Sequence, residues 1–163
     1  MLLAPRVDRA LHDLRVRYFR NLARRMPAHV TMLFPFRSSI DARTISAVGA
    51  LSAGLRAFDA TFRESGRFRN DVVWLRPEPC DHFERVSDAV LAAFPDLAPY
   101  DGAHQGRTLH LTVASRLRGH EADQLLDDIG DVLPLTDRVE LLSLMVETGS
   151  GWRETHSWPL PVA

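Results

Sequence analysis

Hydrophobic residues recur along this chain at two spacings, and these spacings predict an alternation of amphipathic helices and short strands. Apolar residues three and four positions apart are typical of a helix that buries one face, and short apolar runs between turn-forming residues are typical of strands. The predicted helices cover residues 6–20, a segment after an N-cap at Asp41, a segment with a capping-box-like start at Asp81 and Glu84, and residues 120–130. The predicted strands cover residues 2–4, 28–36, 58–64, 71–76 and 109–115, and a final hairpin has arms at residues 138–147 and 152–160.

Turn formers and proline predict where some of these elements end. Ser65 and Gly66 predict a turn directly after the strand at residues 58–64. Pro77 has no N–H for a sheet ladder and therefore predicts the end of the strand at residues 71–76. Cys80, three residues later, is interpreted as a helix-entry or packing residue because no nearby feature predicts a reactive thiolate.

The order of the elements repeats once along the chain. Each half runs strand, helix, histidine-containing strand, helix, strand, and the histidines His29 and His110 are 81 residues apart. We therefore predict an α+β fold with a bilobal, pseudo-two-fold duplication, in which two mainly antiparallel sheets are flanked by helices around a central cleft. The chain is expected to form one domain over residues 1–163, with lobes near residues 1–66 and 67–163 that exchange elements.

The repeated elements share a tripeptide that combines a histidine with a threonine. The two copies are His29-Val30-Thr31 and His110-Leu111-Thr112. A strand sends residues i and i+2 to the same face, so each copy presents an imidazole beside a hydroxyl. Two histidines supply a proton acceptor and a proton donor near neutral pH, and two hydroxyls can hold the oxygens of a phosphoryl group. Taken singly, each tripeptide is equally consistent with a strand that contains a partly buried structural histidine.

Composition and charge restrict the chemistry that this pair can perform. All twenty basic residues are arginines, which excludes a covalent lysyl adduct and a P-loop lysine. Residues 1–40 carry eight arginines and two acids, whereas residues 119–140 carry seven acids and one arginine, so one side is expected to favour anions unless the arginines form a solvated helix face. A single cysteine and the short apolar stretch at residues 1–4 lead us to expect a cytoplasmic protein without a membrane span.

Four segments spread over most of the chain form a recognisable set. The first histidine motif continues into a Pro-Phe pair, a Gly-Arg-Phe segment precedes an apolar strand and a Pro-Glu-Pro segment, and the second histidine motif continues into Val-Ala. These segments are residues 27–36, residues 66–68 with 72–75, residues 77–79, and residues 110–114. Together they resemble the 2H phosphoesterases, and in particular their 2′-5′ RNA ligase-like branch.

This resemblance implies a metal-independent phosphoesterase that acts on 2′,3′-cyclic phosphates or 2′-5′ linkages of RNA or nucleotides without a cofactor. The implied catalytic residues are His29, Thr31, His110 and Thr112. For hydrolysis we assign His110 as the base and His29 as the acid, with both threonines donating to phosphate oxygens. If a 5′-hydroxyl replaced water, the same groups would perform ATP-independent ligation.

Further residues are predicted to contact the substrate, for which a nucleotide or an RNA terminus is expected. Strand parity places Arg116 on the face of His110 and Arg37 on the face of His29, and Arg107 lies in the preceding loop. Phe36, Phe68 and Tyr100 are candidates for stacking on a nucleobase, although each is also consistent with a core role. A monomer is the expected oligomeric state.

Two other functions are consistent with the sequence. The first is a nucleotide- or RNA-binding module that uses the same cleft without turnover. The second is a metal hydrolase that uses both histidines as ligands, for which His104, Asp101 or His82 would have to supply the third. The chain has no H-x-H or H-E-x-x-H spacing that would favour the second.

Overall fold

The structure of this chain is a computed structural model that describes residues 1–18, 26–69, 71–102, 108–149 and 151–162. Its strands are β1 (Leu2–Leu3), β2 (His29–Val30), β3 (Phe58–Arg67), β4 (Val73–Glu78), β5 (Leu111–Ala114), β6 (Leu135–Val139), β7 (Leu141–Thr148) and β8 (Gly151–Pro159). Its α-helices are α1 (Pro5–Ala10), α2 (His12–Tyr18), α3 (Ala42–Gly54), α4 (Cys80–Ala93) and α5 (Gly119–Gly130), and a 3₁₀ turn, η1, covers Pro99–Gly102.

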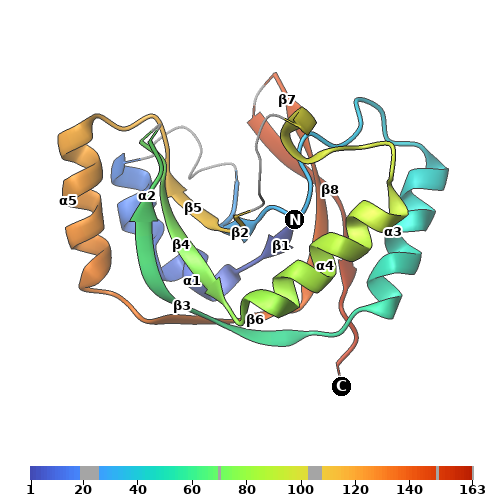
Figure 1. Cartoon of the computed structure of the whole chain (residues 1–163), viewed down its shortest axis with the longest axis horizontal. Coiled ribbons are helices and arrows are strands. Elements are labelled where there is room, and N and C mark those ends of the chain that lie inside the picture. The colour runs from blue at the N-terminus through green and yellow to red at the C-terminus, as the bar shows by residue number, and fades with distance from the viewer. Residues whose placement is uncertain (19–25, 70, 103–107, 150, 163) are drawn as a thin grey trace.

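The strands form a curled antiparallel sheet with helices on both flanks (Figure 1). The strand order is β6-β3-β4-β5-β2-β1-β7-β8, and every neighbouring pair is antiparallel. Helices α1, α2 and α5 lie at one end of the molecule, and α3 and α4 lie at the other. The predicted α+β class is confirmed, and the two predicted sheets are joined through β2 and β5.

Strands from the two halves of the sequence alternate in the sheet. Strand β3, from the first half, lies between β6 and β4 from the second half. Strands β7 and β8, from the end of the chain, extend the sheet beyond β1. An exchange of elements between lobes was predicted, and the division near residue 66 stays a prediction.

The helix predicted for residues 6–20 is interrupted at Leu11. The backbone hydrogen bonds continue past the break, because Leu11 donates to the Val7 carbonyl at 2.9 Å and accepts from the Arg15 amide at 2.8 Å. The two parts have different neighbours, since α1 packs on β6 and α2 packs on α5 and β5. The Asp41 N-cap of α3 is confirmed, with its side chain accepting from the Thr44 amide at 2.8 Å.

Several predicted strand boundaries were wrong. The turn expected at Ser65-Gly66 is absent, because β3 continues to Arg67 and Gly66 pairs with Trp74. Strand β4 also continues through Pro77, which pairs with Phe62 of β3. The proline is tolerated there because the β4–β5 ladder ends at Leu75 and needs no N–H beyond it.

Three further elements differ from the predictions. The first histidine strand is shorter than the predicted residues 28–36, because β2 ends at Val30 and the chain then bends. Helix α4 begins after Pro79 with no side-chain cap, so the capping box at Asp81 and Glu84 was wrong. The predicted hairpin arm at residues 138–147 is divided at Glu140 between β6, which pairs with β3, and β7, which pairs with β8.

A buried carboxylate on β6 connects that strand to helix α1 near the start of the sequence. Asp137 of β6 is 3% exposed, and one of its oxygens accepts from the backbone amides of Arg6 and Val7 at 2.7 and 3.0 Å. Its other oxygen accepts from the Arg138 amide at 2.8 Å. Asp137 therefore satisfies amides in the first turn of α1, for which Ala4 provides no side-chain cap.

The Asp137→Ala substitution should lower the free energy of unfolding by about 2–3 kcal/mol, because it leaves buried amides without an acceptor. Asp137→Asn retains one carbonyl oxygen and should cost roughly half as much. Urea denaturation measures both values. Asp59→Ala removes an exposed partner of Arg138 and is the control, with an expected change within about 0.5 kcal/mol. Equal losses in Asp137→Ala and Asp59→Ala would contradict this account.

Candidate active site

A large cleft lies on the concave side of the sheet. It encloses about 1670 Å³ and is lined by both histidine motifs, by β7, and by parts of α3 and α4. This volume exceeds the roughly 300–1,000 Å³ typical of sites for small ligands. The cleft therefore has room for a ligand larger than a typical small molecule.

The two histidine motifs face each other at the centre of this cleft. Val30 of β2 pairs directly with Leu111 of β5 in antiparallel register, and both side chains are buried. Because side chains alternate along a strand, the flanking histidines and threonines lie on the opposite face, which forms the floor of the cleft.

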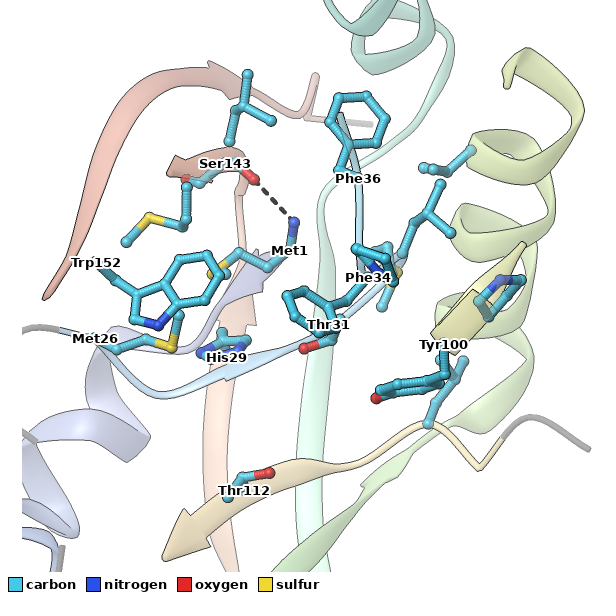
Figure 2. A pocket seen from close by; sticks show the side chains of 18 of the residues that line it. Met1, Met26, His29, Thr31, Phe34, Phe36, Tyr100, Thr112, Ser143 and Trp152 are labelled. Atoms are coloured by element: carbon cyan, nitrogen blue, oxygen red, sulfur yellow. Dashed lines mark hydrogen bonds between the residues drawn. The ribbon is translucent and has the colours of Figure 1, made fainter. Parts of the chain in front are cut away.

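Figure 2 shows this arrangement from close by. His29 and Thr31 come from the segment that begins with β2, and Thr112 comes from the neighbouring β5. The hydroxyl groups of Thr31 and Thr112 approach the space between these segments. The site thus offers two imidazoles and two hydroxyls in a pseudo-two-fold arrangement.

Both imidazoles are oriented by the same kind of backbone contact. Nδ1 of His29 lies 2.8 Å from the Pro27 carbonyl oxygen, and Nδ1 of His110 lies 2.8 Å from the Thr108 carbonyl oxygen. A carbonyl accepts only from a protonated nitrogen, so in the neutral rings the proton is on Nδ1 and the lone pair is on Nε2. Each Nε2 is thereby available to exchange a proton with a substrate.

The electrostatic environments of the two histidines differ. Burial lowers the pKa of His29 to about 4, and the Met1 amino group, Arg15 and His110 add to the effect, opposed by the bond to the Pro27 carbonyl. Burial also lowers the pKa of His110, with no positive neighbour among the causes. Both rings therefore favour the neutral form, and Arg15 adds to this effect at His29, whereas the role of base is assigned to His110 from the sequence. Which histidine is the base and which the acid stays a prediction.

An aromatic stack lies beside His110. The Phe68 ring meets the His110 imidazole edge-on at 4.9 Å and packs on Trp74 at 5.3 Å. Trp74 in turn covers Gly66, where a Cβ would lie 2.3 Å from the indole ring. The Gly-Arg-Phe segment of the sequence thus permits a stack that restricts His110, and Phe68, a candidate for base stacking, already contacts that histidine.

A second aromatic cluster lies at the mouth of the cleft and consists of Phe34, Tyr100 and Trp152. The Phe34 ring lies 6.2 Å from the Tyr100 ring and 6.0 Å from the Trp152 ring. Phe34 and Tyr100 are 43% and 37% exposed, which is unusual for large apolar side chains beside a core. Tyr100 was predicted, whereas Phe34 and Trp152 were missed because no sequence signal connects residues so far apart.

Phe36 and Arg37 line the cleft but are engaged with neighbouring side chains. The Phe36 ring packs edge-on against Phe94 at 4.9 Å. Arg37 donates to both carboxylate oxygens of Asp96 at 3.1 and 2.9 Å, and its guanidinium lies 5.6 Å from the Phe94 ring centroid. A role in substrate binding for these two residues stays a prediction.

The expected position of Arg116 was wrong, because β5 ends at Ala114 and strand parity does not extend further. Arg116 has a φ of 59° and is outside the set of described residues that line the cleft, where Ser115 is found instead. Arg107 lies outside the described residues. Arg69, from the turn between β3 and β4, lines the cleft and was not predicted.

The candidate third metal ligands are only partly described. His82 packs edge-on against Phe58 at 5.0 Å, and it is not among the described residues that line the cleft. His104 and the side chain of Asp101 lie outside the described part of the chain. Within that part, no three histidine, cysteine or acidic residues are grouped as a metal site would require.

The described helices also include none long and apolar enough to cross a membrane.

The α+β fold and the two H-x-T motifs in one cleft agree with the resemblance to the 2H phosphoesterases. A family model described as the 2′-5′ RNA ligase superfamily matches residues 3–151. The chain belongs to this superfamily and is an enzyme of the 2H phosphoesterase type. A search of the curated proteins returned no match.

Solved structures support the fold at low sequence identity. E. coli LigT in its apo form is similar with a TM-score of 0.61 and 17% identity, over 98% of this chain and 93% of LigT. TT0787 of Thermus thermophilus is similar with a TM-score of 0.59 and 20% identity, over 99% of both chains. LigT with bound 3′-AMP is similar with a TM-score of 0.60 and 18% identity, over 97% of this chain and 93% of LigT.

The lowered pKa of His29 predicts a contribution to stability that depends on pH. The unfolded chain binds a proton near pH 6.5 and the folded chain near pH 4, so this contribution is fully present above pH 6.5 and is lost as the pH falls toward 4. The His29→Gln variant cannot titrate at this position and should lose less stability over that range. Urea denaturation of both proteins from pH 7 to pH 4 measures the difference, which isolates His29 from the carboxylates. Equal losses in the two proteins would contradict the pKa assignment.

Proposed function

We propose that this enzyme hydrolyses 2′,3′-cyclic phosphates at the end of RNA or on nucleotides, by general acid and base catalysis between His29 and His110. The observation that supports this most directly is the antiparallel pairing of Val30 with Leu111, which places the motifs across from each other on one face. A reaction that adds a nucleophile on one side of phosphorus and releases an oxygen on the other needs a base and an acid in such positions.

In this mechanism, Nε2 of neutral His29 accepts a proton from a water molecule whose oxygen attacks phosphorus. The bond between phosphorus and one ribose oxygen breaks, and Nε2–H of protonated His110 donates the proton that this oxygen needs. Burial lowers the pKa of His110, and the negative charge of a phosphate bound beside the ring acts in the opposite direction and raises it. The hydroxyls of Thr31 and Thr112 donate to the non-bridging oxygens, where negative charge increases.

The same groups support ligation. If a 5′-hydroxyl takes the place of water, His29 accepts its proton and the cyclic phosphate becomes a phosphodiester, with His110 protonating the released ribose oxygen. The energy comes from opening the cyclic phosphate, so neither ATP nor a lysine is required, which is consistent with a chain without lysine. We propose that no metal takes part in either reaction.

A nucleotide fits the chemistry of the cleft. Structures of E. coli LigT have been solved with 3′-AMP and with NADP+. In this chain the aromatic cluster of Phe34, Tyr100 and Trp152 offers ring faces and edges at the mouth of the cleft, and we propose that it receives the nucleobase. The phosphate then lies at the histidine motifs further inside.

His29→Ala and His110→Ala should each lower kcat by roughly 10²–10⁴-fold, because each removes one proton transfer. Thr31→Val and Thr112→Val should lower it less, because each removes one hydrogen bond of the phosphate clamp. Hydrolysis of 2′,3′-cyclic nucleotides in EDTA measures these effects, and the wild-type rate should have a bell-shaped pH profile. If kcat is unchanged in both His29→Ala and His110→Ala, the mechanism is overturned. Tight nucleotide binding without turnover would favour the binding-module alternative, and activity that requires a metal would favour the metal hydrolase.

Removal of one ring from the aromatic cluster should weaken nucleotide binding. Phe34→Ala and Trp152→Ala should each raise KM for adenosine 2′,3′-cyclic phosphate by roughly 5- to 100-fold with a small effect on kcat, because base stacking contributes about 1–3 kcal/mol. Phe34→Tyr retains the ring and is the matched control. Ribose 2′,3′-cyclic phosphate lacks a base, so its KM should not change in any of these variants. A similar rise in KM for this base-free substrate would contradict the assignment.

A further inference from the structure

An ion pair between a buried guanidinium and a partly exposed carboxylate lies next to the cleft and is not explained by the proposed chemistry. Arg15 of α2 is 2% exposed, and its guanidinium binds Asp8 of α1. Nη2 of Arg15 also donates to the Met26 carbonyl at 2.9 Å, whereas its buried Nε has no hydrogen-bond partner among the described residues. Burial of the guanidinium carries a desolvation cost, whereas the Asp8 side chain is 32% exposed, so the pair is weak evidence for a purely stabilising role.

The ion pair holds the backbone on both sides of Pro27. Arg15 binds the carbonyl of Met26, and the carboxylate of Asp8 accepts from the amide of Ala28 at 2.8 Å. The carbonyl of Pro27 lies between these two anchored groups and accepts from Nδ1 of His29. The direction of that carbonyl, and with it the orientation of the imidazole, therefore depends on both members of the pair.

The positive charge of Arg15 favours the neutral form of the His29 imidazole, which is the form that the contact with the Pro27 carbonyl orients. A guanidinium stays protonated at all working pH values, so it opposes a second positive charge nearby. The charged or titratable groups that act on His29 are the Met1 amino group just before β1, Arg15 of α2, and His110 just before β5. Burial lowers the pKa of the Met1 amino group to about 5, so at neutral pH Arg15 is the positive charge among them. Of these three, Arg15 also carries an anchoring contact to the backbone beside Pro27.

We propose that Arg15 and Asp8 form a positioning pair for His29, which holds the Pro27 carbonyl so that Nδ1 stays protonated and Nε2 stays free to accept a proton. This inference rests on the proposed function in one respect, the role of His29 as the base. The pair acts through His29 and has no contact with the reacting atoms. It also makes the two histidine motifs electrostatically different despite their symmetric placement.

Nitrogen-15 NMR of the histidine side chains in the ligand-free protein tests this proposal, because it reports the tautomer and the titration of His29 without any turnover. In Arg15→Met we expect a mixture of tautomers and a His29 pKa shifted toward 6.5, because an anchor and a positive charge are both removed. In Asp8→Asn we expect no rise in the pKa, because the acceptor for the Ala28 amide remains and the charge of Arg15 is no longer balanced. A purely structural role would move both variants in the same direction.

Arg17→Met is the matched control, because Arg17 lies on the same helix with its side chain 64% exposed, and it should leave the spectrum of His29 unchanged. Should Arg15→Met fail to fold, Arg15→Lys keeps the charge without the forked guanidinium. It should retain the low pKa while the tautomers become mixed. The proposal is overturned if folded Arg15→Met leaves both the tautomer and the titration of His29 unchanged. It is also overturned if Arg15→Lys leaves the tautomer of His29 unchanged.

The rate measurement separates this proposal from the proposed function. With 2′,3′-cyclic nucleotide as substrate, Arg15→Met should lower kcat by at least roughly tenfold at neutral pH, with KM little changed and the acidic limb of the pH profile moved upward. An inactive wild-type protein whose His29 spectrum still responds to Arg15→Met would overturn the proposed function and support the positioning role. An active wild type with unchanged kcat and pH profile in Arg15→Met would overturn the positioning role alone.

Discussion

The pairing of Val30 with Leu111 is the constraint on which the rest of this molecule depends. It joins the two halves of the curled sheet, and it sets the faces on which both H-x-T motifs lie. A shift of one residue in either strand would turn that strand's histidine and threonine into the core and expose its buried apolar residue. Packing of Val30 and Leu111, which are 1% and 0% exposed, therefore also determines the geometry of the cleft. The same apolar contacts that stabilise the fold select the register required for chemistry.

Symmetry at the level of the backbone does not extend to the electrostatics. Both imidazoles are held through Nδ1 by a carbonyl two residues earlier in the chain, yet the buried Arg15 guanidinium acts on His29. In the proposed mechanism this difference favours His29 as the proton acceptor, because a positive neighbour disfavours the protonated form. The difference arises from the helices and strands packed around each motif and not from the motifs themselves.

Low sequence identity to LigT and TT0787 is compatible with a shared fold because few positions carry strict requirements. The motif residues occupy short segments, and the remaining sheet positions need only apolar side chains on the inner face. Gly66 is one of the few positions outside the motifs with a strict steric requirement, since the Trp74 ring leaves no space for a Cβ. Aromatic residues divide between two roles, with Phe36 and Phe68 packed on Phe94 and His110, and Phe34 exposed at the cleft mouth.

The sequence by itself determined the α+β class, the two H-x-T motifs and the general alternation of helices and strands, because these follow from local periodicity and from residue types close together in the chain. It did not show that the first helix divides at Leu11 or that β6 and β7 are separate strands. It did not determine where strands end, since the ladders of β3, β4 and β5 decide that Gly66 and Pro77 lie inside strands and that parity stops before Arg116. Only the tertiary structure brought Phe34 to Trp152 and placed the Arg15–Asp8 pair behind His29. Contacts between residues distant in the chain depend on packing, and the burial that lowers the pKa of His29 is a property of the assembled fold alone.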